Sequence, residues 1–482
     1  MPEKKPEITF ISPYEDITAY SVRLLSSVLR EKGYPTRIVF APSVLEEGGS
    51  GQESLEKLAA EIRRVAAGSS LIGFSFFSCH LPFVAALSRE VKKRMSTPVI
   101  WGGKHITAQP EDAAGYADLV CIGEGEISLT ALLLAIEKGE EAASVAGIWP
   151  VRGEGVTKGT PSPLVQDLDS LPLPDFSMEG HYVWDSRTLV ELDTALMEEQ
   201  IRKSCRDKAL YYQTMASRGC SYSCSYCYHF KDLYAGQRYL RNRGHAKVIG
   251  EIRSMLEKFP FFEEVCLSDD NFFSLGEEQI REFAALYRKE IGKPLRCLAY
   301  PHEISRRKLE ILTEAGLREI QVGIQTGSKR TLKLYRRGPS PERVLEAVTI
   351  LNEFKDTLMP YYDFIIDNPY EEREDVLETL RLITRFPRPY RLNVFSLTFF
   401  PGTELHGKAL RDGRITDSTK TWQFSGKSYV NFLFLYIFTR PFPTWLTGLL
   451  LSRPAVALLD NKPAVSLLYS LKGLLKTVVR RK

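Results

Sequence analysis

The first 143 residues alternate short apolar runs with longer amphipathic stretches, and this alternation limits the fold more than any other feature. The apolar runs cover residues 8–11, 37–40, 71–77, 98–101 and 119–122, and hydrophobic residues recur at helical spacing between them. Runs with so little polar alternation are typical of strands buried on both faces. The pattern predicts an α/β domain, with a parallel sheet covered by helices on both sides.

A second series of strand-like runs occupies the middle of the chain. The runs cover residues 209–216, 264–271, 295–300, 319–328, 361–369 and 392–397, with helical stretches between them. The series indicates six successive strand–helix units. In parallel barrels, polar residues at the carboxyl ends of strands face the reaction site. Candidate site residues are therefore expected where each run ends.

Between the first two of these runs, Cys220, Cys224 and Cys227 stand within eight residues. Three thiolates so close on one loop can converge on a soft metal centre, and cysteine sulfur holds iron–sulfur clusters. Zinc is an alternative, with His229, His245 or a distant cysteine as the fourth ligand of a structural site. The other five cysteines are scattered singly: Cys79, Cys121, Cys205, Cys266 and Cys297. This scatter argues against disulfides and indicates a reducing, cytosolic setting.

The cysteine loop, with Tyr226 directly before the last cysteine, resembles the cluster loop of radical S-adenosylmethionine (radical SAM) enzymes. The six units resemble that family's partial (β/α)6 barrel. In the family, S-adenosylmethionine chelates the free iron of a [4Fe-4S] cluster and is cleaved to a 5′-deoxyadenosyl radical. The resemblance implies that Cys220, Cys224 and Cys227 are catalytic and bind the metal cluster. It also implies S-adenosylmethionine or substrate contacts for Tyr226, Asp269, Asp270, Asn271, Gln325, Ser328, Arg336, Ile366 and Asp367.

Glycine-containing loops follow several strands of the first series, at the strand ends where such sheets bind ligands. The stretches 101–105 and 121–126 resemble the cobalamin-binding domain that precedes many radical SAM barrels. That resemblance implies cobalamin contacts for Ser75, Gly102, Gly103, His105, Gly123, Glu124 and Gly125. The loop after the first strand lacks the Asp-x-His-x-x-Gly motif that supplies a lower axial histidine. His80 is the alternative cobalt ligand, although a lone histidine that opens a helix is more often a surface or capping residue.

Four regions are expected along the 482 residues. Residues 1–143 form the Rossmann-like cobalamin-binding domain, and residues 144–207 form a hairpin and a Pro-rich linker. Residues 208–412 form the barrel, within which Arg238, Arg241 and Arg243 precede a helix and are expected on a solvated face and in helix packing rather than in phosphate binding. Residues 413–482 form an apolar helical region with a basic end. That region either caps an apolar substrate pocket, lies in a membrane interface, or is packed as an ordinary helical subdomain.

The two resemblances imply a cobalamin-dependent radical SAM enzyme with three cofactors: a [4Fe-4S] cluster, S-adenosylmethionine and cobalamin. Methyl transfer to an unactivated carbon of a hydrophobic or lipid-like substrate is the expected reaction, with ring formation or rearrangement as an alternative. A tRNA or protein methylthiotransferase is disfavoured, because only Cys79 and Cys121 lie in the N-terminal domain. A non-catalytic cobalamin-binding or redox-sensing protein is the alternative from another class.

The expected partners are a small hydrophobic substrate and an external one-electron reductant of the flavodoxin or ferredoxin type. The net charge of +4 gives no support to a nucleic-acid partner. The start of the chain shows no secretory signal, and no apolar run reaches the length of a spanning helix. We expect a cytoplasmic protein, with peripheral contact at the inner membrane face if the C-terminal region binds lipid.

Overall fold

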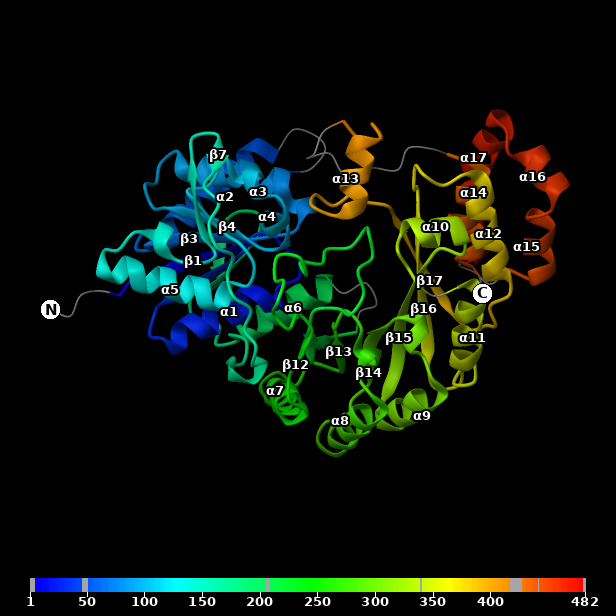
Figure 1. Cartoon of the computed structure of the whole chain (residues 1–482), viewed down its shortest axis with the longest axis horizontal. Coiled ribbons are helices and arrows are strands. Elements are labelled where there is room, and N and C mark those ends of the chain that lie inside the picture. Colours follow the sequence, from blue (N-terminus) through cyan, green and yellow to red (C-terminus); the bar gives the residue numbers. More distant parts are fainter. Residues whose placement is uncertain are drawn as a thin grey trace. The chain divides into compact units, whose positions relative to one another are not determined.

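The computed structural model describes residues 5–45, 51–204, 209–338, 340–416, 427–440 and 442–479 (Figure 1). The chain divides into two compact units. The first contains Met1–Thr214 and Phe230–Glu264, and the second contains Met215–His229 and Val265–Lys482. The cysteine loop belongs to the second unit, whereas the segment directly after it belongs to the first.

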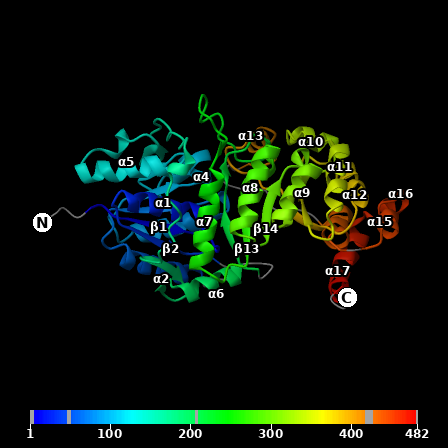
Figure 2. The same ribbon diagram turned by 90° about the horizontal axis from the view of Figure 1, so that it is seen from below.

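The first unit contains a nine-stranded sheet in the order β7-β6-β5-β4-β3-β1-β2-β8-β9. Its predicted strands are confirmed, and they pair in parallel: β1 (Ile8–Ser12), β2 (Thr36–Phe40), β3 (Leu71–Ser75), β4 (Val99–Gly102) and β5 (Leu119–Cys121). The helices between them are α1 (Tyr20–Glu31), α2 (Gly51–Val65), α3 (Leu81–Lys92), α4 (Lys104–Ala108) and α5 (Gly125–Lys138). Helices α1 and α5 lie against one face of the sheet and α2 against the other (Figure 2), and α3 packs against α2.

Four further strands extend this sheet at both edges. The predicted hairpin is present as β6 (Ile148–Arg152) and β7 (Gly155–Val156), and β6 pairs antiparallel with β5. Strands β8 (His181–Trp184) and β9 (Leu189–Glu191), which precede α6 (Thr194–Ser204), were not predicted. Strand β8 pairs in parallel with β2, and its buried His181 has Nε2 3.2 Å from Oδ2 of Asp175. A stretch that was predicted as part of the linker therefore belongs to the core.

The second sheet has six strands in chain order, which confirms the predicted six units. They are β10 (Tyr211–Thr214), β13 (Glu264–Leu267), β14 (Leu295–Ala299), β15 (Leu317–Gln325), β16 (Met359–Ile366) and β17 (Arg391–Ser396). Strands β13 to β17 pair in parallel. The short strands β11 (Ser217–Arg218) and β12 (Arg241–Asn242) flank the loop region. Parallel pairing brings the carboxyl ends of β13 to β17 to one edge, where a site is expected.

Helices follow the strands of the second sheet. They are α8 (Glu277–Glu290), α9 (Arg306–Ala315), α10 (Lys329–Leu334), α11 (Pro341–Asn352), α12 (Arg373–Thr384) and α13 (Glu404–Arg411). In the first unit, α7 (His245–Lys258) begins after β12. Helices α8, α9, α11 and α12 lie along the outer side of the sheet (Figure 1).

The last described helices of the chain pack beside α12 (Figures 1 and 2). They are α14 (Tyr429–Phe432), a π-helical turn (Leu433–Phe438), α15 (Thr444–Leu450), α16 (Arg453–Leu459) and α17 (Lys462–Val479). Phe434 is buried, and its ring centroid lies 5.6 Å from that of Phe364 on β16. Within the described residues, every helix is too short or too polar to cross a membrane. The start of this region is thus packed on the barrel.

Candidate active site

The base of the cysteine loop is held by Asp269, which follows β13. Its carboxylate accepts hydrogen bonds from the Ala216 N–H at 3.0 Å and from the Ser217 hydroxyl. Burial raises the pKa of Asp269 to about 6, although these hydrogen bonds oppose the rise. A buried carboxylate needs such donors, so this contact fixes where the loop leaves the sheet.

The middle of the loop is held through Ser225, directly after the second cysteine. Its N–H donates to the Tyr335 carbonyl at 3.0 Å, and its hydroxyl donates to the Leu334 carbonyl at 2.7 Å. The Ser225 carbonyl accepts from the N–H of Leu405 at 2.8 Å. The loop is therefore anchored to the end of α10 and to the first turn of α13.

A guanidinium lies beside the cysteines, and it belongs to Arg337. Its Nη1 lies 3.6 Å from Sγ of Cys224 and donates to the Tyr226 hydroxyl at 2.8 Å. Cys224 is buried, Cys220 is half-buried and Cys227 is exposed. Arginine stays protonated in proteins, so Arg337 places a positive charge beside the buried sulfur of Cys224.

Arg337 was missed by the sequence analysis, which selected its neighbour. The side chain of Arg336 is 59% exposed and forms an ion pair with Glu404 at 2.7 Å. Arg336 has a φ of 51°, so the chain turns sharply after α10 and the two adjacent side chains separate. Residue type and position alone do not distinguish these two arginines.

Aromatic residues support the same guanidinium. The rings of Tyr222 and Tyr300 stack with centroids 3.9 Å apart, and the Arg337 guanidinium lies 4.3 Å from the Tyr300 centroid. The Tyr222 hydroxyl donates to Glu303 at 2.6 Å. Stacking on an aromatic face restricts a guanidinium more than a hydrogen bond alone does. Arg337 is thus held in place by its hydrogen bond to Tyr226 and by the ring of Tyr300.

In the first unit, glycines lie at the carboxyl edge of the sheet. Gly103 and Gly123 both have a φ of 94°, which favours glycine. A Cβ on Gly103 would lie 2.7 Å from the backbone of Phe76, and a Cβ on Gly123 would lie 1.9 Å from the Tyr234 hydroxyl. The chain's own Phe76 and Tyr234 therefore require these glycines. Tyr234 is buried, and its hydroxyl has no hydrogen-bond partner within the described residues.

Two family models match the chain, one over the region of the first sheet and one over the region that contains the cysteine loop. The B12 binding domain model matches residues 6–133, and the Radical SAM superfamily model matches residues 215–383. The chain is a radical SAM enzyme with a B12-binding domain. Two matched domains in one chain give this enzyme its three cofactors: a [4Fe-4S] cluster, S-adenosylmethionine and cobalamin.

Known proteins with the same architecture are similar to this radical SAM enzyme. An uncharacterized methyltransferase of Pyrococcus horikoshii is 26% identical over 347 residues, which cover 70% of this chain and 68% of the relative. TsrM of Kitasatospora setae, a radical S-adenosylmethionine methyltransferase, has a TM-score of 0.63 at 16% identity, covering 85% of this chain and 78% of TsrM. OxsB, a cobalamin-dependent S-adenosylmethionine radical enzyme, has a TM-score of 0.70 at 14% identity, covering 99% and 80%. The two structures show a shared fold.

The donor set of the radical SAM enzyme suits an iron–sulfur cluster. Three thiols on one anchored loop, with a guanidinium beside the buried one, have the chemistry that such a cluster needs. No three His, Cys, Asp or Glu side chains of the described residues gather closely enough to hold a metal ion, and this includes the three cysteines. Each thiolate of a [4Fe-4S] cluster binds a different iron, so the three sulfurs need not gather around one point to hold it.

The residues predicted to contact S-adenosylmethionine occupy different environments. Asn271 is buried, its Oδ1 accepts from the Tyr300 N–H at 3.2 Å, and its Nδ2 has no partner within the described chain. Asp270 is exposed. Ser328 caps α10 and donates to Asp375 at 2.6 Å. Gln325 has a φ of 74° at the end of β15. The free amide of Asn271 is the donor in this set that is best placed for a ligand.

Two further predicted residues end β16. Ile366 is buried and pairs with Ser396 on β17. Asp367 has a φ of 60° and accepts from the Ser396 hydroxyl at 2.6 Å and from Nδ2 of Asn431 at 2.9 Å. Burial raises the pKa of Asp367. Asp367 thus connects two strands to α14, and a cofactor contact stays a prediction for both residues.

Two predicted cobalamin residues are engaged within the first unit. The His105 ring is buried, its Nδ1 lies 2.8 Å from the Ser78 hydroxyl, and its Nε2 lies 3.1 Å from Oδ2 of Asp112. Glu124 forms a two-pronged ion pair with Arg241, at 2.7 and 2.9 Å. Arg241 is buried, so its expected place on a solvated face is wrong. Arg243 is also buried, and its Nη2 lies 2.6 Å from Glu251.

The other residues that were predicted to contact cobalamin are partly exposed at the edge of the first sheet. Ser75, Gly102 and Gly125 are half-buried, and Phe77 is 40% exposed. The Tyr14 ring, from the loop without a histidine, meets Phe77 at 5.7 Å and His80 at 4.9 Å between centroids. Burial lowers the pKa of His80, which favours the neutral imidazole. This aromatic edge and the unpartnered Tyr234 hydroxyl suit a large planar cofactor, and the individual contacts stay predictions.

Proposed function

We propose that this enzyme transfers a methyl group to an unactivated carbon of a hydrophobic substrate. The observation that carries the proposal is the union of a B12-binding domain with a radical SAM domain in one chain. The names of the Pyrococcus horikoshii relative and of TsrM, both methyltransferases, support it. When bound, S-adenosylmethionine at the cluster would supply a radical that removes hydrogen from the substrate, and cobalamin would pass on a methyl group received from a second S-adenosylmethionine.

The residues of the second unit have distinct tasks in this proposal. Cys220, Cys224 and Cys227 hold the cluster, and Arg337 keeps a positive charge against Cys224. Asn271 donates its free amide to S-adenosylmethionine. Asp269 acts on the loop rather than on the cofactor, because its two oxygens accept from Ala216 and Ser217. An external one-electron reductant of the flavodoxin or ferredoxin type completes the reaction.

In the first unit, the proposed cobalamin surface is the carboxyl edge of β1, β3 and β4. Ser75, Phe77 and Gly102 present half-buried or exposed surface there. The buried Tyr234 hydroxyl provides an additional donor close to Gly123. His105 and Glu124 act as supports of this edge, since Ser78 and Asp112 engage the former and Arg241 the latter.

Anaerobic reconstitution tests the proposal. The protein is loaded with iron, sulfide and hydroxocobalamin, reduced, and incubated with S-adenosylmethionine that carries a deuterated methyl group. We expect 5′-deoxyadenosine, and a labelled product when an apolar extract of the source cells is added. Cys220→Ala should abolish both signals. If the wild-type protein yields no 5′-deoxyadenosine, the proposal is wrong, and a product that lacks the label would instead support ring formation or rearrangement.

A further inference from the structure

The last three helices expose apolar side chains to an unusual degree. Trp445 and Leu449 on α15 are 70% and 58% exposed, and Leu458 on α16 is 72% exposed. Leu467 and Leu471 on α17 are 60% and 41% exposed. Elsewhere in the described chain, large exposed hydrophobic residues are scattered singly. Residues four apart share one face of a helix, so α15 and α17 each present an apolar stripe to solvent.

The same part of the sequence has a strong excess of positive over negative charge. Residues 427–482 contain nine Lys and Arg and a single acidic residue, Asp460. Since the whole chain has a net charge of +4, residues 1–426 are net negative. The basic residues are Lys427, Arg440, Arg453, Lys462, Lys472, Lys476, Arg480, Arg481 and Lys482. Apolar stripes within a basic segment are the composition of helices that lie in a membrane interface.

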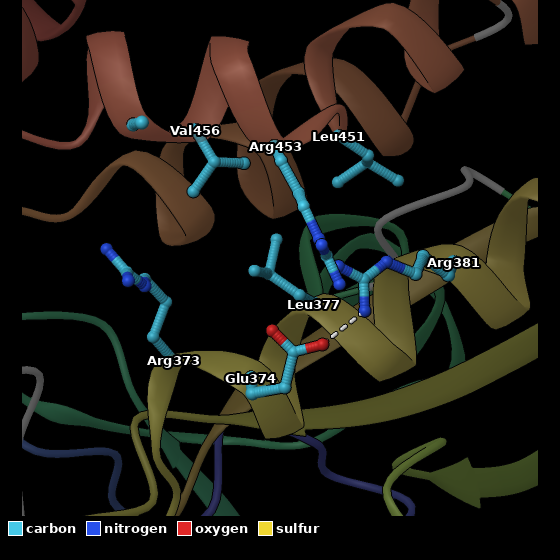
Figure 3. A pocket seen from close by; sticks show the side chains of 8 residues that line it. Arg373, Glu374, Leu377, Arg381, Leu451, Arg453 and Val456 are labelled. Carbon is cyan, nitrogen blue, oxygen red and sulfur yellow. Dashed lines mark hydrogen bonds and ion pairs between the residues drawn. The ribbon is translucent and has the colours of Figure 1, made fainter.

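A pocket of about 590 Å³ lies where α12 meets α15 and α16. Figure 3 shows Arg453 reaching from α16 toward Arg381 and Glu374 on α12. Arg381 is paired with Glu374, and Arg373 lies 3.1 Å from Asp460. Arg453 has no acidic partner within the described residues. Three arginines and one glutamate leave this pocket positive, with Leu451 and Val456 as an apolar wall, which suits an anionic group on an apolar chain.

We propose that α15, α16 and α17 dock this enzyme on an anionic phospholipid bilayer. Trp445 and the exposed leucines enter the boundary between headgroups and acyl chains, where tryptophan is favoured. Arg453 and its pocket bind a lipid phosphate. No helix of the described residues is suited to cross the bilayer, so the contact is interfacial. The apolar stripes distinguish this partner from nucleic acid, for which charged and polar side chains would be needed.

Vesicle flotation with the full-length, cofactor-loaded enzyme tests this docking, which does not depend on the proposed methyl transfer. We expect the protein to float with phosphatidylcholine vesicles that contain phosphatidylglycerol, and to remain behind with phosphatidylcholine alone. Binding should weaken as salt is raised. The double variant Trp445→Glu/Leu449→Glu should lose at least about tenfold in bound fraction, and Arg453→Glu several-fold, because both oppose an anionic surface.

Matched changes elsewhere serve as controls. Leu134→Glu replaces a leucine on α5 that is 42% exposed, and Arg288→Glu reverses an exposed charge on α8. Both should bind vesicles as the wild type does, and every variant should retain S-adenosylmethionine cleavage. Equal flotation of the wild type and Trp445→Glu/Leu449→Glu would overturn the proposal. So would a wild-type dimer that this variant converts to a monomer without any lipid binding, since a second copy would then cover the face.

Discussion

Arg337 is the side chain through which the barrel acts most directly on the cluster loop. It lies 3.6 Å from Sγ of Cys224, donates to Tyr226 and stacks on Tyr300. A fixed positive charge stabilises the more negative of two redox states at close range. We therefore assign Arg337 a positioning role that also affects the reduction potential of a bound cluster.

Arg337→Gln should lower the midpoint potential of the reconstituted cluster, because the reduced cluster loses a neighbouring positive charge. A redox titration followed by electron paramagnetic resonance measures this shift. Arg336→Gln is the control, since that side chain is exposed and paired with Glu404. An unchanged potential in Arg337→Gln, together with a normal iron content, would contradict the assigned role.

Glu371, in the loop after β16, is a second residue with an unusual environment. Its Oε1 lies 3.4 Å from the Thr326 hydroxyl, and burial raises its pKa from 4.5 to about 7. The folded chain thus retains a proton that the unfolded chain releases near pH 4.5. Stability from this group is fully present below about pH 4.5 and is lost as pH rises toward 7.

Glu371→Gln should remove this dependence on pH. Each pKa unit corresponds to about 1.4 kcal/mol, so the variant should gain about 1 to 3 kcal/mol relative to the wild type between pH 5 and pH 8. Urea unfolding of both proteins at the two pH values measures the difference. A parallel pH dependence in wild type and variant would show that Glu371 is not the titrating group.

At the scale of elements, buried ion pairs hold the segment from β12 to α7 within the first unit. Arg241 reaches Glu124 at the start of α5, and Arg243 reaches Glu251 on α7. The Tyr212 hydroxyl also donates to Glu251, at 2.9 Å. Removal of one partner leaves the other charge buried without its counter-ion. The resulting loss of folding free energy is larger than the net contribution of the intact pair.

Arg243→Met should therefore destabilise the enzyme by about 3 to 5 kcal/mol, because Glu251 is then left buried and charged. Arg238→Met is the control from the same segment, since Arg238 is exposed and donates only to the Leu240 carbonyl. Thermal unfolding of the two variants measures the contrast. Equal melting temperatures would mean that the Arg243–Glu251 pair contributes nothing to the fold.

At the scale of the whole molecule, the proposed cofactor residues divide between the two compact units. The cysteines lie in the second unit, whereas Ser75, Phe77, Gly102 and Gly123 lie in the first. Each set of residues depends on the carboxyl edge of a group of parallel strands, β1 to β5 for cobalamin and β13 to β17 for the cluster loop. Loss of one cofactor therefore leaves the residues for the other intact.

The variant Cys220→Ala/Cys224→Ala/Cys227→Ala should lose iron, sulfide and S-adenosylmethionine cleavage but still bind hydroxocobalamin. Metal analysis and the visible corrin spectrum after gel filtration measure the two properties separately. Cys266→Ala is a suitable control, because that cysteine lies on β13, outside both the loop and the proposed cobalamin edge. A triple variant that loses the corrin as well would show that the two sites depend on each other.

The strands β1 to β5 of the first sheet, the six strands of the second sheet and the cysteine loop were predictable from the sequence alone. Apolar runs between amphipathic stretches locate the strands, because periodicity is a local property of the chain. The spacing of Cys220, Cys224 and Cys227 is local in the same way. These features can therefore be predicted without knowing which distant residues are in contact.

The hydrogen bonds and ion pairs between distant polar residues became known only from the tertiary structure. Glu124 is 117 positions from Arg241, and His181 becomes a core residue only through Asp175 and its own pairing with β2. Arg337 rather than Arg336 faces the cysteines because the backbone turns between them. Charge partners and side-chain directions depend on the packing of distant segments, and no local pattern encodes them.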